Sequence, residues 1–142
     1  MRTRELPRAR DLTPEERARW CNGLGPKAGK TVSSKIVSWF LLALLRAAGV
    51  ADLYRECGND HDLYYTLGGD ADDRLLYDLV FFGSMYETSV KTNMLARPIG
   101  RLFSYACFRA VRECGNRGPY VMRIRSLSLA ELREKQSQVA NG

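Results

Sequence analysis

The sequence predicts a mostly α fold class, as one small helical domain, and three observations support this prediction. The chain has 142 residues, the length of an ordinary domain, and 45% of them are hydrophobic, which is sufficient for one core. Signals that start and stop helices recur along the chain at intervals typical of helices. Only residues 120–124 are typical of a strand, and one short run cannot form a sheet.

The first predicted elements are a short helix and a glycine-rich loop. Thr13, Pro14 and Glu16 match the N-cap, first and third positions of a helix, which is expected to run to about Trp20. Residues 22–30 contain three glycines and one proline. This composition predicts a loop with unusual backbone freedom.

Five further helices are expected, at residues 33–48, 52–67, 71–92, 98–112 and 127–136. Gly68 and Gly69 are predicted to stop the second of these helices through a left-handed C-cap, and Asp70 to cap the next one. That helix is expected to turn its apolar residues towards the core, namely Leu75, Leu76, Leu79, Phe82 and Tyr86.

The domain organisation follows from these elements. Residues 1–12 are predicted to be an irregular basic segment, 13–126 the helical domain, and 127–142 a C-terminal helix with a polar tail. The apolar run 36–50 is too short and too interrupted for a membrane span, so a buried helix is expected, with a membrane-associating helix as the alternative. The Arg-rich residues 1–10 do not resemble a signal peptide.

The charge distribution favours anionic partners. The net charge is +6, from 22 basic and 16 acidic residues, and the basic residues gather at both ends around an acidic centre at 52–78. Phospholipid surfaces, nucleic acids and acidic proteins all fit this balance. A duplex DNA binder would instead show a continuous basic stripe. Four cysteines without a CxxC pair exclude a disulfide-dense scaffold and a typical zinc site.

The only histidine of the chain, His61, lies in a pattern that suggests chemistry. His61 and Tyr65 share a helix face, and Asp62 is rotated from it by about 100°. If the turn at residues 68–69 folds the next helix back antiparallel, Asp78 lies at the height of His61. Asp78 is then expected to accept a hydrogen bond from one imidazole nitrogen, which leaves the other to deprotonate water. Tyr65 is expected to hold the same carboxylate.

These residues resemble a known family. The motif His61-Asp62-x-x-Tyr65, followed by Asp78-x-x-Phe81, is similar to the pair of active-site helices of the phospholipase A2 superfamily, in its compact bacterial, phage and parvoviral forms. The segment 22–26 resembles the glycine-rich calcium loop of that family, and Cys57 matches a cysteine that precedes its His-Asp pair. The resemblance covers about half of the chain, roughly residues 20–86.

The resemblance implies calcium-dependent hydrolysis of the sn-2 ester of phospholipids. His61 would be the base that activates water, oriented by Asp78, which Tyr65 supports. Ca²⁺ would be held by the Asp62 carboxylate and by oxygen ligands from the loop. These ligands are the backbone carbonyls of Cys21, Gly23 and Gly25. The implied partner is an anionic phospholipid surface rather than nucleic acid. The implied setting lies outside the producing cytoplasm, as a secreted protein or in a phage particle.

Two other interpretations stay open. In the first, the aspartates at 62, 72, 73 and 78 only solvate helix ends of a structural domain. In the second, the chain is a non-enzymatic basic helical module that binds nucleic acid or works with a phage, and its binding would depend steeply on salt. An HD-type metal phosphohydrolase is excluded, because such sites need several histidines and this chain has one.

Overall fold

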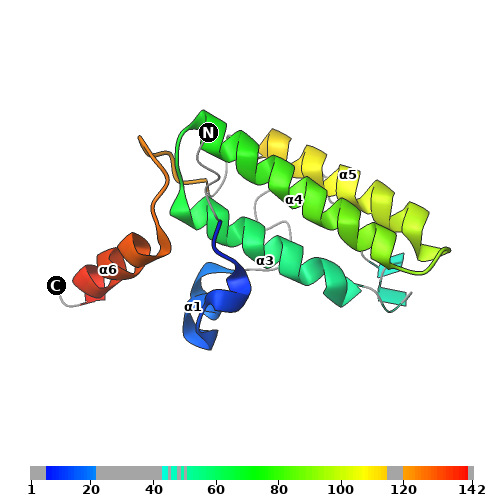
Figure 1. Cartoon of the computed structure of the whole chain (residues 1–142), viewed down its shortest axis with the longest axis horizontal. Helices are drawn as coiled ribbons and strands as arrows, with labels where there is room; N and C mark the ends of the chain where they lie inside the picture. Colours follow the sequence, from blue (N-terminus) through cyan, green and yellow to red (C-terminus); the bar gives the residue numbers. More distant parts are fainter. Residues whose placement is uncertain are drawn as a thin grey trace.

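The computed structural model describes residues 6–21, 43–44, 46–47, 49, 51–114 and 120–140. Within these ranges the mostly α class is confirmed, because every regular element is a helix and the only strand-like feature is one isolated bridge. The elements are η1 (Ala9–Asp11), α1 (Pro14–Trp20), α3 (Ala51–Leu67), α4 (Ala71–Lys91), α5 (Ala96–Cys114) and α6 (Leu129–Ala140) (Figure 1).

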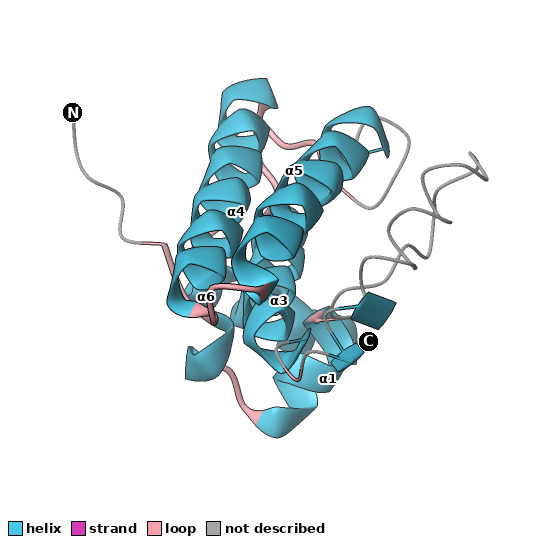
Figure 2. Ribbon diagram, turned by 90° about the vertical axis from the view of Figure 1, so that its right-hand side faces the viewer, coloured by secondary structure: helices cyan, strands magenta, loops and turns pink. Residues whose placement is uncertain are grey.

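Three long helices form the body of the molecule. α4 packs against both α3 and α5, and η1 and α1 pack against α3. Figure 1 shows the three long helices running alongside one another, and Figure 2 shows α4 next to α5. Along the α3–α4 interface Cys57 meets Thr88, whereas Tyr64 stacks on Tyr77 with ring centroids 5.2 Å apart. These two helices therefore run in opposite directions.

The turn between α3 and α4 follows from local sequence signals. Gly68 and Gly69 have φ angles of +67° and +144°, which L side chains rarely adopt. The Asp70 side chain then accepts hydrogen bonds from the backbone N–H groups of Asp72 and Asp73, and the Asp73 carboxylate accepts one in return from the Asp70 N–H. This reciprocal capping box fixes the start of α4.

The segment that follows α5 returns to this turn. Arg123 donates its backbone N–H to the Gly69 carbonyl at 2.9 Å, and Leu127 donates to the Leu67 carbonyl at 3.2 Å. The Tyr77 hydroxyl donates to the Ser126 hydroxyl at 2.5 Å. The return segment, residues 120–127, therefore satisfies backbone groups that the end of α3 would otherwise leave exposed.

Two core clusters lie along the long helices. The first surrounds the α3–α4 turn and contains Trp20, Leu63, Tyr64, Tyr65, Leu67, Tyr77, Tyr120, Leu127 and Leu132. The second lies nearer the other end, where α3, α4 and α5 meet, and contains Tyr54, Cys57, Phe81, Met85, Ala96 and Phe103. Burial of such apolar surface is the main force that holds the helices together.

The core face predicted for α4 is wrong for four of its five residues, whereas Phe82 is half-buried and packs against Phe108 of α5, with ring centroids 5.1 Å apart. Leu75, Leu76, Leu79 and Tyr86 are 40–49% exposed, and the buried aromatic and sulfur side chains of α4 are instead Tyr77, Phe81 and Met85. α4 carries apolar residues on more than one face, so periodicity alone did not identify the face that meets α3 and α5. The consequence is an apolar stripe on the outer side of α4.

Several element boundaries differ from the prediction. α5 begins at Ala96 rather than residue 98, because the Asn93 side chain accepts the Ala96 N–H at 2.7 Å and caps the helix there. α6 begins at Leu129 and ends at Ala140 rather than spanning 127–136. Residues 9–11, expected to be irregular, form a short 3₁₀ turn. The predicted loop 22–30 and most of the predicted helix 33–48 lie outside the described residues.

Three cysteines can be placed, and none of them is in a disulfide: Cys21, Cys57 and Cys107. Across the part of the chain that the structure describes, no helix is long and apolar enough to cross a membrane.

The turn geometry predicts opposite effects for two glycine-to-alanine substitutions. A Cβ on Gly68 would lie 2.3 Å from the Val121 carbonyl oxygen and would sit at positive φ. Gly83 lies within α4 with open space around its Cβ position. We expect Gly68→Ala to lower the free energy of unfolding by at least about 1–2 kcal/mol. Gly83→Ala is expected to raise it by about 0.5–1 kcal/mol.

Urea unfolding followed by circular dichroism measures both changes, and Gly83→Ala serves as the matched control for loss of a glycine. Equal effects of the two substitutions would contradict the turn geometry described above.

Candidate active site

The predicted pair of His61 and Asp78 meets across the interface between α3 and α4. Nε2 of His61 lies 3.0 Å from Oδ1 of Asp78. Both side chains are buried, and Asp78 is completely inaccessible to solvent. The geometry follows from the turn: seven residues of α3 before Gly68 and eight residues of α4 after Asp70 bring the two side chains to the same height.

Tyr65 joins the same carboxylate, as the sequence predicted. One helical turn after His61, its hydroxyl donates to Oδ1 of Asp78 at 2.7 Å. Oδ1 therefore accepts two hydrogen bonds, one from each of two side chains that share a face of α3. A buried carboxylate needs such partners, because desolvation of an unpaired charge is very costly.

The other carboxylate oxygen faces two arginines that the sequence analysis missed. Nη1 of Arg112, on α5, lies 3.0 Å from Oδ2 of Asp78, and Nε of Arg74 lies 3.9 Å from it. Arg74 also donates to the backbone carbonyls of Val111 and Arg112 near the end of α5. The spacing of four residues between Arg74 and Asp78 was a usable signal. No local signal connected Arg112 with Asp78.

These contacts set the charge of Asp78. Burial acts to raise the pKa of its carboxyl group, but the hydrogen bonds from His61, Tyr65 and Arg112 together outweigh burial. The pKa of Asp78 is therefore lowered, and the group is an anion at neutral pH. The pKa of Tyr65 is raised, first by burial and then by its hydrogen bond to Asp78, so Tyr65 remains a donor.

The imidazole of His61 packs against two aromatic rings. Its centroid lies 4.1 Å from that of Tyr65 and 4.5 Å from that of Phe81. Because ionised Asp78 can only accept, Nε2 of His61 carries the hydrogen and Nδ1 carries the lone pair of a neutral ring. Among the described residues, none forms a hydrogen bond with Nδ1.

The residues expected to bind metal are only partly described. Asp62 is half-buried on α3, and its backbone carbonyl accepts a hydrogen bond from the Thr66 hydroxyl. Cys21 follows α1, and its pKa is raised to about 11, first by burial and next by the negative charge of Asp62. Gly23 and Gly25 lie outside the described residues.

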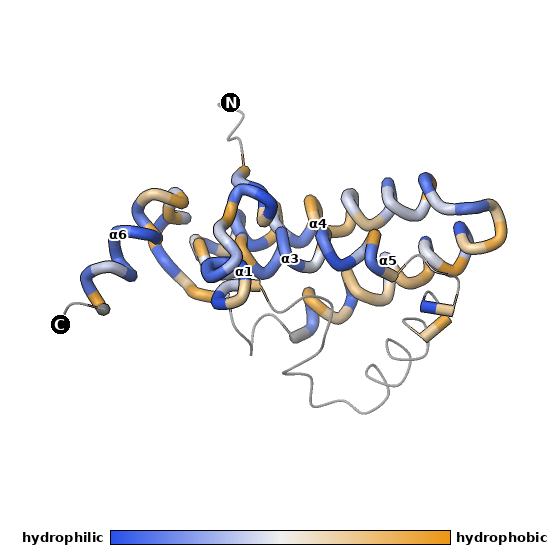
Figure 3. Tube along the Cα trace, turned by 90° about the horizontal axis from the view of Figure 1, so that it is seen from below, coloured by the Kyte–Doolittle hydropathy of each residue, from blue (hydrophilic) through white to orange (hydrophobic). Residues whose placement is uncertain are grey.

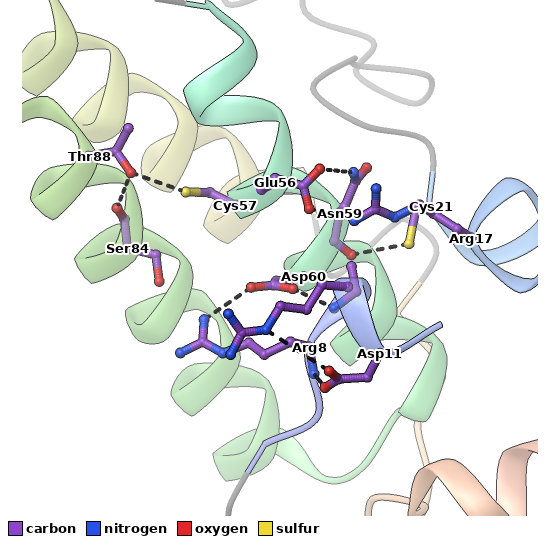
Figure 4. A network of polar contacts seen from close by, with 12 residues as sticks. Arg8, Asp11, Arg17, Cys21, Glu56, Cys57, Asn59, Asp60, Ser84 and Thr88 are labelled. Atoms are coloured by element: carbon purple, nitrogen blue, oxygen red, sulfur yellow. Dashed lines mark hydrogen bonds and ion pairs between the residues drawn. The ribbon is translucent and has the colours of Figure 1, made fainter. Parts of the chain in front are cut away.

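A network of polar contacts anchors α1 and the N-terminal segment to α3 just before His61 (Figure 4). Arg17 of α1 forms an ion pair of 2.5 Å with Glu56, and the Cys21 thiol donates to the Asn59 carbonyl at 3.4 Å. Asp60 accepts the backbone N–H of Ala9 at 2.6 Å. The point where the predicted loop begins is thus fixed beside the segment that precedes His61 and Asp62.

Within the described ranges, no cluster of three or more His, Cys, Asp or Glu side chains is arranged to hold a metal ion. The calcium site implied by the resemblance contains a single carboxylate, and its other ligands are backbone carbonyls, so it would not form such a cluster.

Comparison of the chain with protein-family models, with curated proteins and with solved structures gave no match. An imidazole hydrogen-bonded to a buried carboxylate, as His61 is to Asp78, is an arrangement suited to general base catalysis.

The lowered pKa of Asp78 predicts a specific loss of stability in acid. In the unfolded chain its pKa is about 3.9. Above that pH the carboxylate is ionised in both states and its stabilising contribution is complete. As the pH falls through 4 towards the lower folded value, the unfolded chain binds the proton first, and the contribution is lost.

Urea unfolding of the parent and of Asp78→Asn between pH 6 and pH 3 measures this contribution. The parent is expected to lose stability more steeply below pH 4 than the variant, which has no carboxyl group at this position. Glu16, whose pKa Arg133 lowers to about 2, contributes equally to both proteins. Parallel curves would show that the ionised Asp78 does not stabilise the fold.

Proposed function

We propose that the chain is a calcium-dependent hydrolase of the phospholipase A2 type, which cleaves the sn-2 ester of phospholipids. The observation that carries this proposal is the cluster in which the only histidine of the chain is held by a buried, ionised Asp78 that Tyr65 also contacts. In this proposal the antiparallel α3–α4 pair forms the active-site helices.

His61 acts as the general base. Its Nδ1 removes a proton from a water molecule while the water oxygen attacks the ester carbonyl carbon. Asp78 stabilises the imidazolium that forms, through the hydrogen bond at Nε2. When the tetrahedral intermediate collapses, the bond to the alcohol oxygen breaks and the imidazolium returns the proton to that oxygen. The products are a free fatty acid and the lysophospholipid, and His61 is neutral again.

The surrounding side chains position the base. Tyr65 and Phe81 fix the plane of the imidazole, and Arg112 and Arg74 keep Asp78 ionised so that it holds His61 in one tautomer. Such preorganisation lowers the cost of reaching the reacting geometry. Arg112 and Arg74 are positioning residues here, because they act on His61 through Asp78.

Calcium would be held by Asp62 together with backbone carbonyls of Cys21, Gly23 and Gly25. The hard oxygen donor of Asp62 fits Ca²⁺, and the influence of its negative charge on the pKa of Cys21 supports a position near the start of the predicted loop. When bound, the ion would polarise the ester carbonyl and stabilise the developing oxyanion.

A lipid-hydrolysis assay tests the proposed mechanism. We expect the full-length protein to release fatty acid from phospholipid vesicles with Ca²⁺ and to stop when a chelator is added. His61→Ala is expected to lower the rate by about 10²–10⁴-fold, the contribution typical of a general base. Tyr65→Phe, which keeps the ring against His61 and loses the hydroxyl, is expected to cause a smaller loss.

Circular dichroism checks that the variants are folded. If His61→Ala hydrolyses vesicles as fast as the parent, the mechanism is wrong. If the parent shows no calcium-dependent hydrolysis and instead binds nucleic acid with a steep dependence on salt, the chain is a basic interaction module.

The role of Asp62 in calcium binding has its own test, because the single histidine gives an imidazole signal that NMR can follow without further assignment. Adding Ca²⁺ is expected to shift the His61 ring signals of the parent. In Asp62→Asn the calcium titration is expected to move to concentrations at least about tenfold higher, since one anionic ligand is lost.

Asp52→Asn is the matched control, because Asp52 lies on the same helix, is exposed and pairs with Arg55 at 3.0 Å. The calcium titration of Asp52→Asn is expected to match that of the parent. An unchanged titration in Asp62→Asn would remove Asp62 from the metal site.

A further inference from the structure

The turn between α4 and α5 presents two large apolar side chains to solvent. Met94 and Leu95 are 80% and 84% exposed, and they are adjacent in the sequence. The turn lies at one end of the molecule, opposite α6 (Figure 1). Figure 3 shows hydrophobic residues gathered at this turn. Single exposed apolar residues are ordinary, but two adjacent ones at a projecting turn call for an explanation.

Capping hydrogen bonds fix the backbone of the turn that carries these side chains. The Thr92 hydroxyl donates to the Ser89 carbonyl at 2.7 Å and closes the end of α4. The Asn93 side chain accepts the Ala96 N–H at 2.7 Å and opens α5. Both helices are therefore capped next to Met94 and Leu95. The pair is presented outward by an ordered turn, which lowers the entropy cost of inserting it into a partner.

The apolar surface continues along the outer side of α4. Val90, Tyr86 and Leu79 are 40–49% exposed, and their spacing of four and seven residues places them on one stripe of the helix. Leu79 follows Asp78 directly, so the stripe extends from the turn to the level of the candidate active site. We call Met94, Leu95 and this stripe the hairpin face.

The chain segment that contains the turn carries only positive charge. Between residues 88 and 101 the chain contains Lys91, Arg97 and Arg101 and no acidic residue. The Arg101 guanidinium lies over the Tyr86 ring, 5.3 Å from its centroid, so it borders the hairpin face directly. The nearest acidic residue along α4 is Glu87. Apolar side chains bordered by cations match the boundary between anionic headgroups and acyl chains.

We propose that the hairpin face docks on an anionic phospholipid bilayer, with Met94 and Leu95 inserted below the headgroups and the three cations among them. Two apolar side chains and a narrow stripe are small beside the ~800 Å² that a stable protein interface buries on each partner. A second copy of the chain would bring the same cations together, which disfavours self-association through this face. A bilayer needs only shallow insertion and charge attraction.

This docking deepens the proposed function, because it names the surface on which the ester substrate would be found. The contact itself needs neither His61 nor calcium. Binding can therefore be measured with chelator present, separately from hydrolysis.

Vesicle flotation in chelator tests the proposal with the full-length protein. Vesicles of phosphatidylcholine alone are compared with vesicles that also contain phosphatidylglycerol. The parent is expected to float with the anionic vesicles and much less with the neutral ones. The double variant Met94→Ser, Leu95→Ser is expected to lose at least about tenfold in vesicle partitioning, because the inserted apolar area is gone.

Two further variants complete the design. Ile124→Ser with Val139→Ser removes two apolar side chains that are 98% and 83% exposed elsewhere, and it is expected to bind like the parent. Lys91→Gln with Arg101→Gln is expected to weaken binding to anionic vesicles by about tenfold or more and to reduce its dependence on salt.

The proposal is overturned if the Met94→Ser, Leu95→Ser variant binds vesicles like the parent. It is equally overturned if the control variant Ile124→Ser, Val139→Ser loses as much vesicle binding as the Met94→Ser, Leu95→Ser variant. It is also overturned if sedimentation shows that the substitutions at Met94 and Leu95 dissociate a dimer instead. Vesicle binding without hydrolysis would support the docking and reject the hydrolase. Calcium-dependent hydrolysis of a soluble short-chain phospholipid without vesicle binding would support the hydrolase and reject the docking.

Discussion

This fold depends on the compensation of one buried negative charge, that of the Asp78 carboxylate. Asp78 is inaccessible to solvent, yet its pKa is lowered, so the helices must supply enough donors to replace water. They do so from three directions: α3 provides an imidazole and a phenol, α4 provides Arg74, and α5 provides Arg112. The relative placement of α3, α4 and α5 is therefore tied to a single side chain.

Of the contacts that Asp78 makes, some could be predicted from the sequence and others could not. The turn at Gly68 and Gly69 and the cap at Asp70 are local signals, so the α3–α4 hairpin and the meeting of His61 with Asp78 were predicted from spacing. Arg112 is 34 residues from Asp78, and its contact depends on how α5 packs. No local pattern reports such packing.

The face of α4 was predicted wrongly for a related reason. The helix carries apolar residues on two sides, and hydrophobic periodicity does not distinguish a side that packs inside the molecule from a side that is exposed. The position of Asp78 in the sequence would have identified the buried side of α4. Because it must face His61, Phe81 and Met85 share its buried side, and Leu79 and Tyr86 turn outward. A charged residue was thus a better guide to the core than the leucines.

The hairpin face and the candidate active site meet along α4. Leu79 is exposed and Asp78 is buried at adjacent positions, so one helix carries the proposed catalytic carboxylate on one side and the proposed lipid contact on another.

The return segment has a consequence for the order in which the molecule is built. Its backbone pairs with Leu67 and Gly69 at the end of α3, and Arg112 completes the Asp78 cluster from α5. During synthesis on the ribosome, α3 and α4 emerge long before these partners do. The nascent hairpin must therefore wait for the hydrogen bond from Arg112, which lies 21 residues beyond the end of α4. Completion of the Asp78 cluster therefore comes after the synthesis of most of α5.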